Sequence, residues 1–192
     1  MPSLTRICQL LPVIVFFWMI VGAVTVFTRD VGARSPRGLG IAVGFWSTLG
    51  AKGLAALAPL WMAIAGAVGL LLSLALFHWA AFSIRGRTFS YAGNQDLPQF
   101  VHSTGPYRYI RNPFYASYLL AIVSTVVMWP NWWGVAIVVG MVGYFEWLAR
   151  FEEAKFEKSP VAAEYAKYKA GRLIPRFTRP GGDNGFTNGA TG

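Results

Sequence analysis

The sequence has little of what a disulfide framework or a metal centre requires. It holds one cysteine, Cys8, and two histidines, His78 and His102, among its 192 residues. A single cysteine forms no internal disulfide, and a structural zinc site takes four cysteine or histidine ligands. We therefore predict neither a disulfide-stapled domain nor a metal site.

Charge is also scarce, and negative charge most of all. Asp and Glu number 8 against 17 Lys and Arg, and 13% of the chain is charged whereas 55% is hydrophobic. A soluble domain of this size could not bury so much apolar surface in one core. The basic residues flank apolar runs, where they face anionic lipid headgroups, and are not interleaved with exposed stacking aromatics. We predict an integral membrane protein whose partner is the lipid bilayer and not a nucleic acid.

Four apolar runs are candidates for membrane-spanning helices, which need about 20 residues to cross the bilayer core. The first could belong to a signal peptide, but it is longer than the ~7–15 residues of a secretory core, and we predict a retained span. The last two are separated only by Pro130-Asn131, which forces an antiparallel helical hairpin. The runs cover residues 10–28, 54–82 with a helix start near Pro59, 114–129 and 132–148.

The predicted fold is all-α, a polytopic membrane protein with about four transmembrane helices and a C-terminal helical segment in the cytoplasm. Segment 150–169 is charged and Ala-rich, which predicts a helix leaving the membrane, broken into two pieces by Pro160. The end of the chain has the composition of a disordered tail. We divide the chain into an N-terminal transmembrane region (1–98), a core (99–177) and a disordered tail (178–192).

Two features of the spans carry further predictions. Gly66, Ala67 and Gly69 lie in the second apolar run, and such small residues allow another helix to approach closely. His78 lies in the same run, where a polar side chain is usually hydrogen-bonded inside the bundle. We predict a packing role for His78 and not a ligand role.

The distribution of Lys and Arg predicts the orientation. Thirteen of the 17 lie in the N-terminus, in the 85–111 loop and from residue 150 onward, against four in the 29–52 loop. By the positive-inside rule, both termini and the 85–111 loop are cytoplasmic. The two most polar segments then meet on one face of the membrane, and we predict a cytoplasmic active site.

These polar segments contain two clusters. One is the segment 105–115, which leads into the third run. The other straddles the end of the fourth, where Glu146, Arg150, Glu153 and Glu157 recur at helical spacing beside Glu152. The hairpin makes the clusters neighbours. A simpler interpretation exists for each, an i,i+4 ion pair between Glu146 and Arg150 and a basic flank before a Pro-started helix, but their coincidence favours a site.

The motifs of segment 99–175 resemble those of a known family. They are Gly105-Pro-Tyr-Arg-Tyr-Ile-Arg-Asn-Pro-Phe-Tyr115, a span hairpin, Arg150-Phe-Glu-Glu153, Tyr165-Ala-Lys-Tyr168 and Arg172-Leu-Ile-Pro175. In this order they resemble the isoprenylcysteine carboxyl methyltransferase family, to which the phospholipid methyltransferases are related. Two departures are Asn112, where eukaryotic members have His, and Ser159-Pro160 in place of Phe-Gly.

The resemblance implies S-adenosyl-L-methionine (SAM) as cofactor and makes 99–177 the methyltransferase core. It implies that Arg150, close to the glutamate pair, holds an acceptor carboxylate, and we take Arg150 and Glu153 as the candidate catalytic residues. The residues it implies for the cofactor pocket are Gln99, Phe100, Val101, His102, Tyr107, Asn112, Pro113, Phe114 and Tyr115, with Glu152 at the polar end.

The chemistry suits these residue types. SAM supplies the reactive methyl group, and Tyr107, Tyr109 and Tyr115 could face its cationic centre. A carboxylate acceptor is already ionised at neutral pH, whereas an amine must first be neutral. Because Asn112 offers no base, we predict a lipophilic acceptor that carries a carboxylate or another nucleophile of low pKa, such as a thiolate.

Two other functions are open to this sequence. Membrane NADPH-dependent sterol or steroid reductases carry a similar Arg-His-Pro-Asn-Tyr run followed by Gly-Glu. Here Pro113 is followed by Phe114-Tyr115-Ala116-Ser117, which lacks that Asn and Glu. A non-enzymatic membrane scaffold is the other possibility, in which Tyr107, Arg111 and Glu152 would be replaceable without loss of a ligand.

Overall fold

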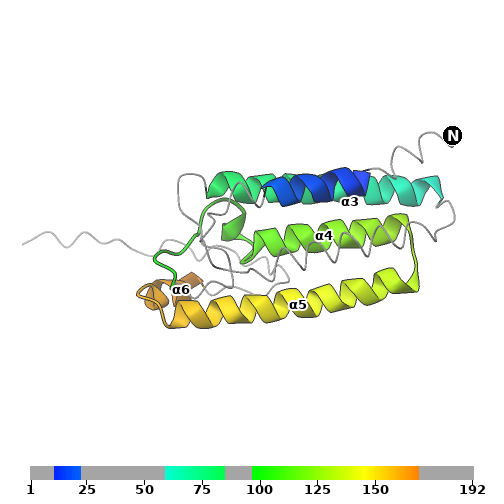
Figure 1. Cartoon of the computed structure of the whole chain (residues 1–192). Coiled ribbons are helices and arrows are strands. Elements are labelled where there is room, and N and C mark those ends of the chain that lie inside the picture. Colours follow the sequence, from blue (N-terminus) through cyan, green and yellow to red (C-terminus); the bar gives the residue numbers. More distant parts are fainter. Residues whose placement is uncertain (1–10, 23–58, 85–96, 169–192) are drawn as a thin grey trace, which may run out of the picture.

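Three long helices, α3, α4 and α5, run side by side, with one shorter helix alongside α3 and two short elements at one end of the bundle (Figure 1). The computed structural model describes residues 11–22, 59–84 and 97–168. The described residues contain helices and no strands, which agrees with the all-α prediction. The elements are a helix at Leu11–Gly22, α3 (Leu60–Ser83), the 3₁₀ turn η1 (Gly105–Arg108), α4 (Pro113–Met128), α5 (Trp132–Glu157) and α6 (Ala162–Tyr168).

Two of these helices, α3 and α5, are long and apolar enough to cross a membrane. α3 begins after Pro59, as predicted, and the Pro59 carbonyl accepts from the amides of Met62 (3.0 Å) and Ala63 (3.2 Å). Its outward face is apolar, with Trp61 and Leu72 exposed, as expected of a surface solvated by lipid. α4 has 16 residues, or about 24 Å at 1.5 Å per residue, and Leu11–Gly22 is shorter still.

The contact between α3 and α4 is close because two glycines lie in it. A Cβ on Gly66 would stand 2.6 Å from the Ser124 carbonyl oxygen and would overlap Met128, and one on Gly69 would overlap the Ser124 hydroxyl. The buried Ser73 hydroxyl donates to the Ser117 carbonyl at 2.6 Å, which links the two helices further along. The predicted close approach of a helix at these glycines is confirmed.

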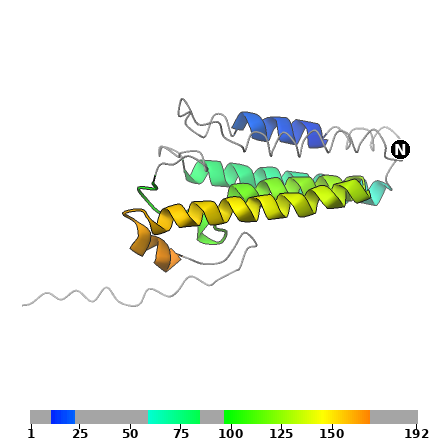
Figure 2. The same cartoon turned by 60° about the horizontal axis from the view of Figure 1, so that its bottom comes forward.

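The helix Leu11–Gly22 lies along α3 (Figures 1 and 2) and contributes Val15, Phe16 and Met19 to the core. Trp18 donates its indole N–H to Nε2 of His78 at 2.9 Å, so Nδ1 of His78 holds the proton and donates to the Leu74 carbonyl at 2.8 Å. His78 is a hydrogen-bonded packing residue, as predicted.

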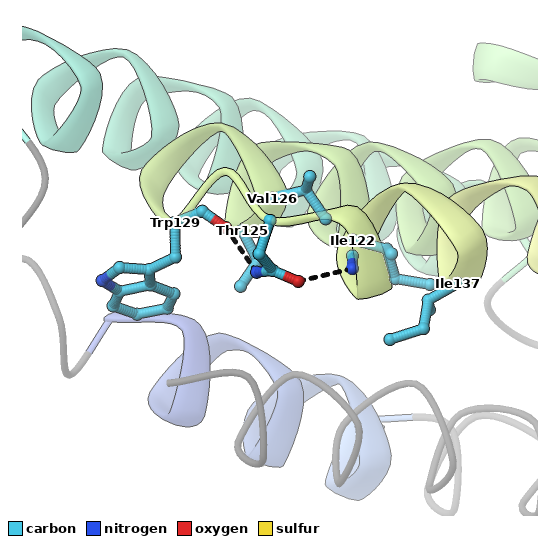
Figure 3. Close-up of a pocket in the computed structure, with 7 residues that line it drawn as sticks. Ile122, Thr125, Val126, Trp129 and Ile137 are labelled. Atoms are coloured by element: carbon cyan, nitrogen blue, oxygen red, sulfur yellow. Dashed lines mark hydrogen bonds between the residues drawn. The ribbon is translucent and has the colours of Figure 1, made fainter. Parts of the chain in front are cut away.

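The predicted hairpin is present. Asn131 caps α5 by accepting from the Gly134 amide at 2.7 Å, and its side-chain amide donates to the Trp129 carbonyl, also at 2.7 Å. Figure 3 shows both bonds and a small pocket at this turn. The pocket lies at the opposite end of the hairpin from the two polar clusters. It is lined by Ile122, Thr125, Val126, Trp129, Asn131, Gly134 and Ile137.

After the apolar run, α5 continues without interruption to Glu157 and therefore carries the second polar cluster on the same helix as the fourth run. The chain then turns at Ser159 and Pro160 and forms α6, so the predicted break at Pro160 is confirmed. The loops 29–52 and 85–96, the motif at 172–175 and the tail 178–192 lie outside the described residues, as does Cys8.

Candidate active site

The polar clusters meet at the open end of the α4–α5 hairpin, on a base of packed aromatic rings. Phe77 of α3 packs edge-on against Phe114 of α4, with ring centroids 5.3 Å apart. Phe145 of α5 stacks on Tyr115 at 5.2 Å and on Tyr118 at 6.2 Å. Aromatic packing therefore joins α3, α4 and α5 directly beneath the charged residues.

Glu152 continues the buried stripe of α5. Met141, Phe145 and Leu148 are buried at helical spacing, and the next position on that face is Glu152. Its Oε1 accepts a hydrogen bond from the hydroxyl of Tyr115 at 2.9 Å. Two residues predicted for the cofactor pocket, 37 positions apart, thus meet across the hairpin.

Glu153 bonds to a different residue. It forms an ion pair with Arg111, which lies in the short link between η1 and α4. Both side chains are largely buried, with 11% of Arg111 and 21% of Glu153 exposed. Arg111 lies in a non-helical link, so no periodicity predicts the direction of its side chain.

Arg150 lies apart from this pair. Its side chain is 67% exposed and donates from Nε to Glu146 at 3.0 Å, one helical turn earlier. The simpler interpretation of these two residues, an intrahelical ion pair, is therefore what the structure contains. Glu146 and Arg150 face one side of α5 while Glu152 and Glu153 bond across to the 111–115 segment. The catalytic roles assigned to Arg150 and Glu153 stay predictions.

The segment before α4 is anchored on the end of α3. His102 Nε2 lies 2.8 Å from the Ser83 carbonyl, and because a carbonyl only accepts, Nε2 is the donor. The His102 ring meets the Tyr107 ring edge-on at 5.0 Å. Gly105 has φ +60°, and a Cβ there would overlap the Ser83 side chain. These contacts bring η1 and Tyr107 to the site.

Tyr107 is placed near Glu152. Burial raises the pKa of the Tyr107 phenol well above its usual range, and the negative charge of Glu152 raises it further. Tyr107, Tyr115 and Glu152 therefore form one group, which we call the Glu152 cluster. All three were predicted for the cofactor pocket.

The other predicted pocket residues divide between the core and the surface. Phe114 packs on Phe77, and Val101 and Pro113 are buried. Asn112 is the residue before α4. Gln99 is exposed and its side chain donates to the Leu97 carbonyl at 3.2 Å, while Phe100 packs edge-on against His102 at 6.1 Å.

α6 folds back at this same end of the bundle, as Figures 1 and 2 show. Its Tyr165 is buried and stacks on Phe156 of α5, with centroids 4.2 Å apart. Burial raises the pKa of Tyr165 to about 12, against the opposing effect of Arg111 and with a contribution from Glu153. Tyr165 thus lies within electrostatic range of the Arg111–Glu153 pair, a proximity that the sequence did not predict.

Comparison with known proteins identifies a family for this chain. The family model described as phospholipid methyltransferase matches residues 61–159, from the first turn of α3 to just beyond α5. No curated protein and no solved structure matches the chain. The matched segment is about half of the 192 residues and holds the aromatic base, the Glu152 cluster and the Arg111–Glu153 pair. The chain therefore belongs to the phospholipid methyltransferase family, which is related to the isoprenylcysteine carboxyl methyltransferases.

Proposed function

We propose that this chain is an integral membrane methyltransferase that uses SAM as methyl donor and a lipophilic acceptor, and that the Glu152 cluster binds the cofactor. The observation that carries the proposal is the bond between Tyr115 and Glu152 across the hairpin. It joins a partly buried carboxylate to a phenol within the segment that matches the methyltransferase family.

The residues of the cluster fit a sulfonium cofactor. Glu152 accepts a hydrogen bond from the Tyr115 phenol, and its carboxylate carries a negative charge that attracts a cation. The ring faces of Tyr107 and Tyr115 can each contribute about 0.5–2 kcal/mol to binding a cation. The carboxylate can also accept hydrogen bonds from hydroxyl or amino groups of the cofactor. SAM supplies the methyl group when bound, and these residues hold and orient it.

The acceptor carboxylate predicted from the sequence needs an arginine to hold it. Arg111 is paired with Glu153 and Arg150 with Glu146, so a carboxylate acceptor would have to displace one of these glutamates. We retain a carboxylate as the first candidate, with Arg150 or Arg111 as its partner. In the carboxylate mechanism, Glu153 is the group whose displacement frees Arg111.

The amine of a phospholipid headgroup is the second candidate acceptor. It is favoured by the charge of the cluster, where aromatic rings and Glu152 suit a cationic headgroup better than an anionic one. The description of the matched family is consistent with it. His102 lies beside Tyr107 and has an imidazole of the type that can take a proton from an ammonium.

For topology we propose four spans, with both termini and the site in the cytoplasm. α4 and the N-terminal helix would cross with their ends in the headgroup layer, since the hydrocarbon core is about 30 Å thick. The thirteen Lys and Arg residues of the proposed cytoplasmic side support this orientation. A site at the end of a membrane hairpin would let a lipophilic acceptor enter laterally.

The test uses the purified full chain in detergent. Titration calorimetry with SAM and, separately, with NADPH distinguishes the methyltransferase from a reductase, and we expect heat from SAM only. Transfer of labelled methyl groups is then measured with vesicles containing a prenylated cysteine, a fatty acid or phosphatidylethanolamine. Binding of NADPH without SAM would overturn the proposal, and binding of neither would favour the scaffold. The labelled product identifies the acceptor.

A further inference from the structure

The Arg111–Glu153 ion pair is the second connection between the same two parts of the chain that Tyr115 and Glu152 join. Arg111 lies four residues before Tyr115, and Glu153 directly follows Glu152. The ion pair spans 42 positions and the hydrogen bond 37. Two adjacent glutamates of α5 therefore bond to two residues four positions apart, one in the η1–α4 link and one in the first turn of α4.

The two connections differ in charge and burial. Arg111 and Glu153 are both ionisable and largely buried, while Glu152 bonds to a neutral phenol. Nε of Arg111 is buried with no hydrogen-bond partner in the part of the chain that the structure describes. The buried guanidinium therefore depends on Glu153 for charge compensation, because a buried charge that loses its partner is strongly destabilised.

α6 lies at the same end of the bundle as this pair (Figure 1). Tyr165 is buried, stacks on Phe156 and lies close enough to Arg111 and Glu153 for their charges to affect its phenol. This environment differs from that of the Glu146–Arg150 pair on the same helix, whose arginine is mostly exposed. Exposed i,i+4 pairs contribute little, whereas the Arg111 pair is largely buried between α5 and the η1–α4 link.

We propose that Arg111 and Glu153 are a positioning pair: their ion pair fixes the start of α4 against α5 in the register that joins Tyr115 to Glu152. Glu153 then acts through Glu152 and does not hold the acceptor. This inference rests on the proposed function and deepens it, since it gives the two adjacent glutamates different tasks.

The experiment is a double-mutant cycle on the full chain in detergent. The variants are Arg111→Gln, Glu153→Gln and the double variant, and the probe is S-adenosylhomocysteine measured by titration calorimetry. Each single variant leaves a buried charge uncompensated, and we expect it to raise the Kd at least about tenfold, the effect of about 1.4 kcal/mol of coupling. The double variant removes both charges, and its Kd should return to within about threefold of the wild type.

Two additional variants serve as controls. Arg111→Lys retains the positive charge and should keep most of the affinity, which gives a folded comparison if Arg111→Gln is unstable. Arg108→Gln removes an exposed arginine three residues away in the same motif and should leave the Kd unchanged. Steady-state kinetics should show a raised KM for SAM and an unchanged KM for the acceptor in Glu153→Gln.

The outcomes are separable. If wild-type protein does not bind S-adenosylhomocysteine, the proposed function fails and the positioning role fails with it. If the wild type binds but the double variant is as weak as the weaker single variant, the positioning role alone is overturned. A raised KM for the acceptor with an unchanged Kd for S-adenosylhomocysteine would instead assign Glu153 to the acceptor.

Discussion

The two ends of the α4–α5 hairpin satisfy their polar groups in different ways. At the turn, Asn131 bonds to Trp129 and Gly134, two and three residues away, and Trp132 and Trp133 stack on each other at 3.8 Å. At the open end, Tyr115 and Arg111 bond to glutamates 37 and 42 residues away. No charged residue occurs between 114 and 145, so the charged residues of the hairpin are confined to its open end.

This difference indicates a structural role for the turn end of the hairpin and makes the open end the candidate site of the chemistry. Local bonds such as those of Asn131 form as part of the turn itself. Buried polar connections between distant segments are costly unless every partner is in place, and such groups gather at functional sites. If the separation is real, changes at the open end should alter ligand binding, and changes at the turn end should alter stability alone.

The largest effect is expected for Glu152→Gln at the open end. It removes the charge of the Glu152 cluster while keeping a similar shape and an acceptor for the Tyr115 hydroxyl. Because a hydrogen bond or contact to a charged group is worth about 1.5–3 kcal/mol, the Kd for S-adenosylhomocysteine should rise about 100-fold. Calorimetry measures it, and Tyr115→Phe, which leaves the carboxylate, should weaken binding less. An unchanged Kd in Glu152→Gln would remove the cofactor site from this cluster.

At the turn end of the hairpin, Gly66→Leu in the α3–α4 contact is a substitution with a comparable free-energy cost. The added side chain would press on Ser124 and Met128, and such overpacking costs about 1–3 kcal/mol or more. We expect a lower Tm in detergent with an unchanged Kd for the protein that remains folded.

Gly140→Leu is the matched control for this lesion. A Cβ on Gly140 meets nothing within 4 Å among the described residues, so the substitution should change stability by no more than about 0.5 kcal/mol. Equal losses from Gly66→Leu and Gly140→Leu would mean that the close α3–α4 approach does not explain the effect, because helix propensity alone favours Leu over Gly at both positions.

Alkaline pH tests the cover that α6 provides over the open end. The pKa of Tyr165 is raised to about 12 in the folded protein, against about 10 in the unfolded chain. Because the unfolded phenol ionises first, this group contributes no pH dependence below about pH 10, and stability falls between about pH 10 and pH 12 by roughly 2–3 kcal/mol. Tyr165→Phe should lose less stability than the wild type over that interval, measured as Tm against pH.

The comparison for this experiment comes from the same helix. Tyr168 is exposed, and Tyr168→Phe should show the same alkaline loss as the wild type. A wild-type curve that matches that of Tyr165→Phe above pH 10 would show that Tyr165 is not buried against the ion pair in solution.

The parts of the fold that the sequence predicted are those set by local chemistry. Pro59 and Pro113 start helices, Pro130-Asn131 makes the turn, and Pro160 ends α5 and separates it from α6. Each of these follows from the fixed φ and missing amide of proline. The close approach at Gly66 also follows from the size of one residue. The proximity of the two polar clusters could also be predicted, because it follows from the hairpin alone.

The separate roles of the site residues were harder to predict from the sequence. The stripe Met141, Phe145 and Leu148 extends to Glu152 by helical periodicity, so the inward direction of Glu152 could be predicted from α5 alone. Arg111 lies outside any helix, and no period gives its direction. Arg150 was favoured because it is close to the glutamates along the chain, but the helix directs it outward. The ion pair with Glu153 and the cover from Tyr165 depend on three-dimensional packing.

The smallest expected effect belongs to Asn131→Ala at the turn. The substitution removes the acceptor for the Gly134 amide and the donor to the Trp129 carbonyl, and loss of such a cap costs about 1 kcal/mol. Thermal unfolding in detergent should show a small fall in Tm, while the Kd for S-adenosylhomocysteine stays at the wild-type value because no bond of Asn131 reaches the open end. If Asn131→Ala weakened binding as Glu152→Gln does, the two ends would be coupled through α4 and α5. The hairpin would then act as one unit, and local bonding at the turn would no longer mark a purely structural role.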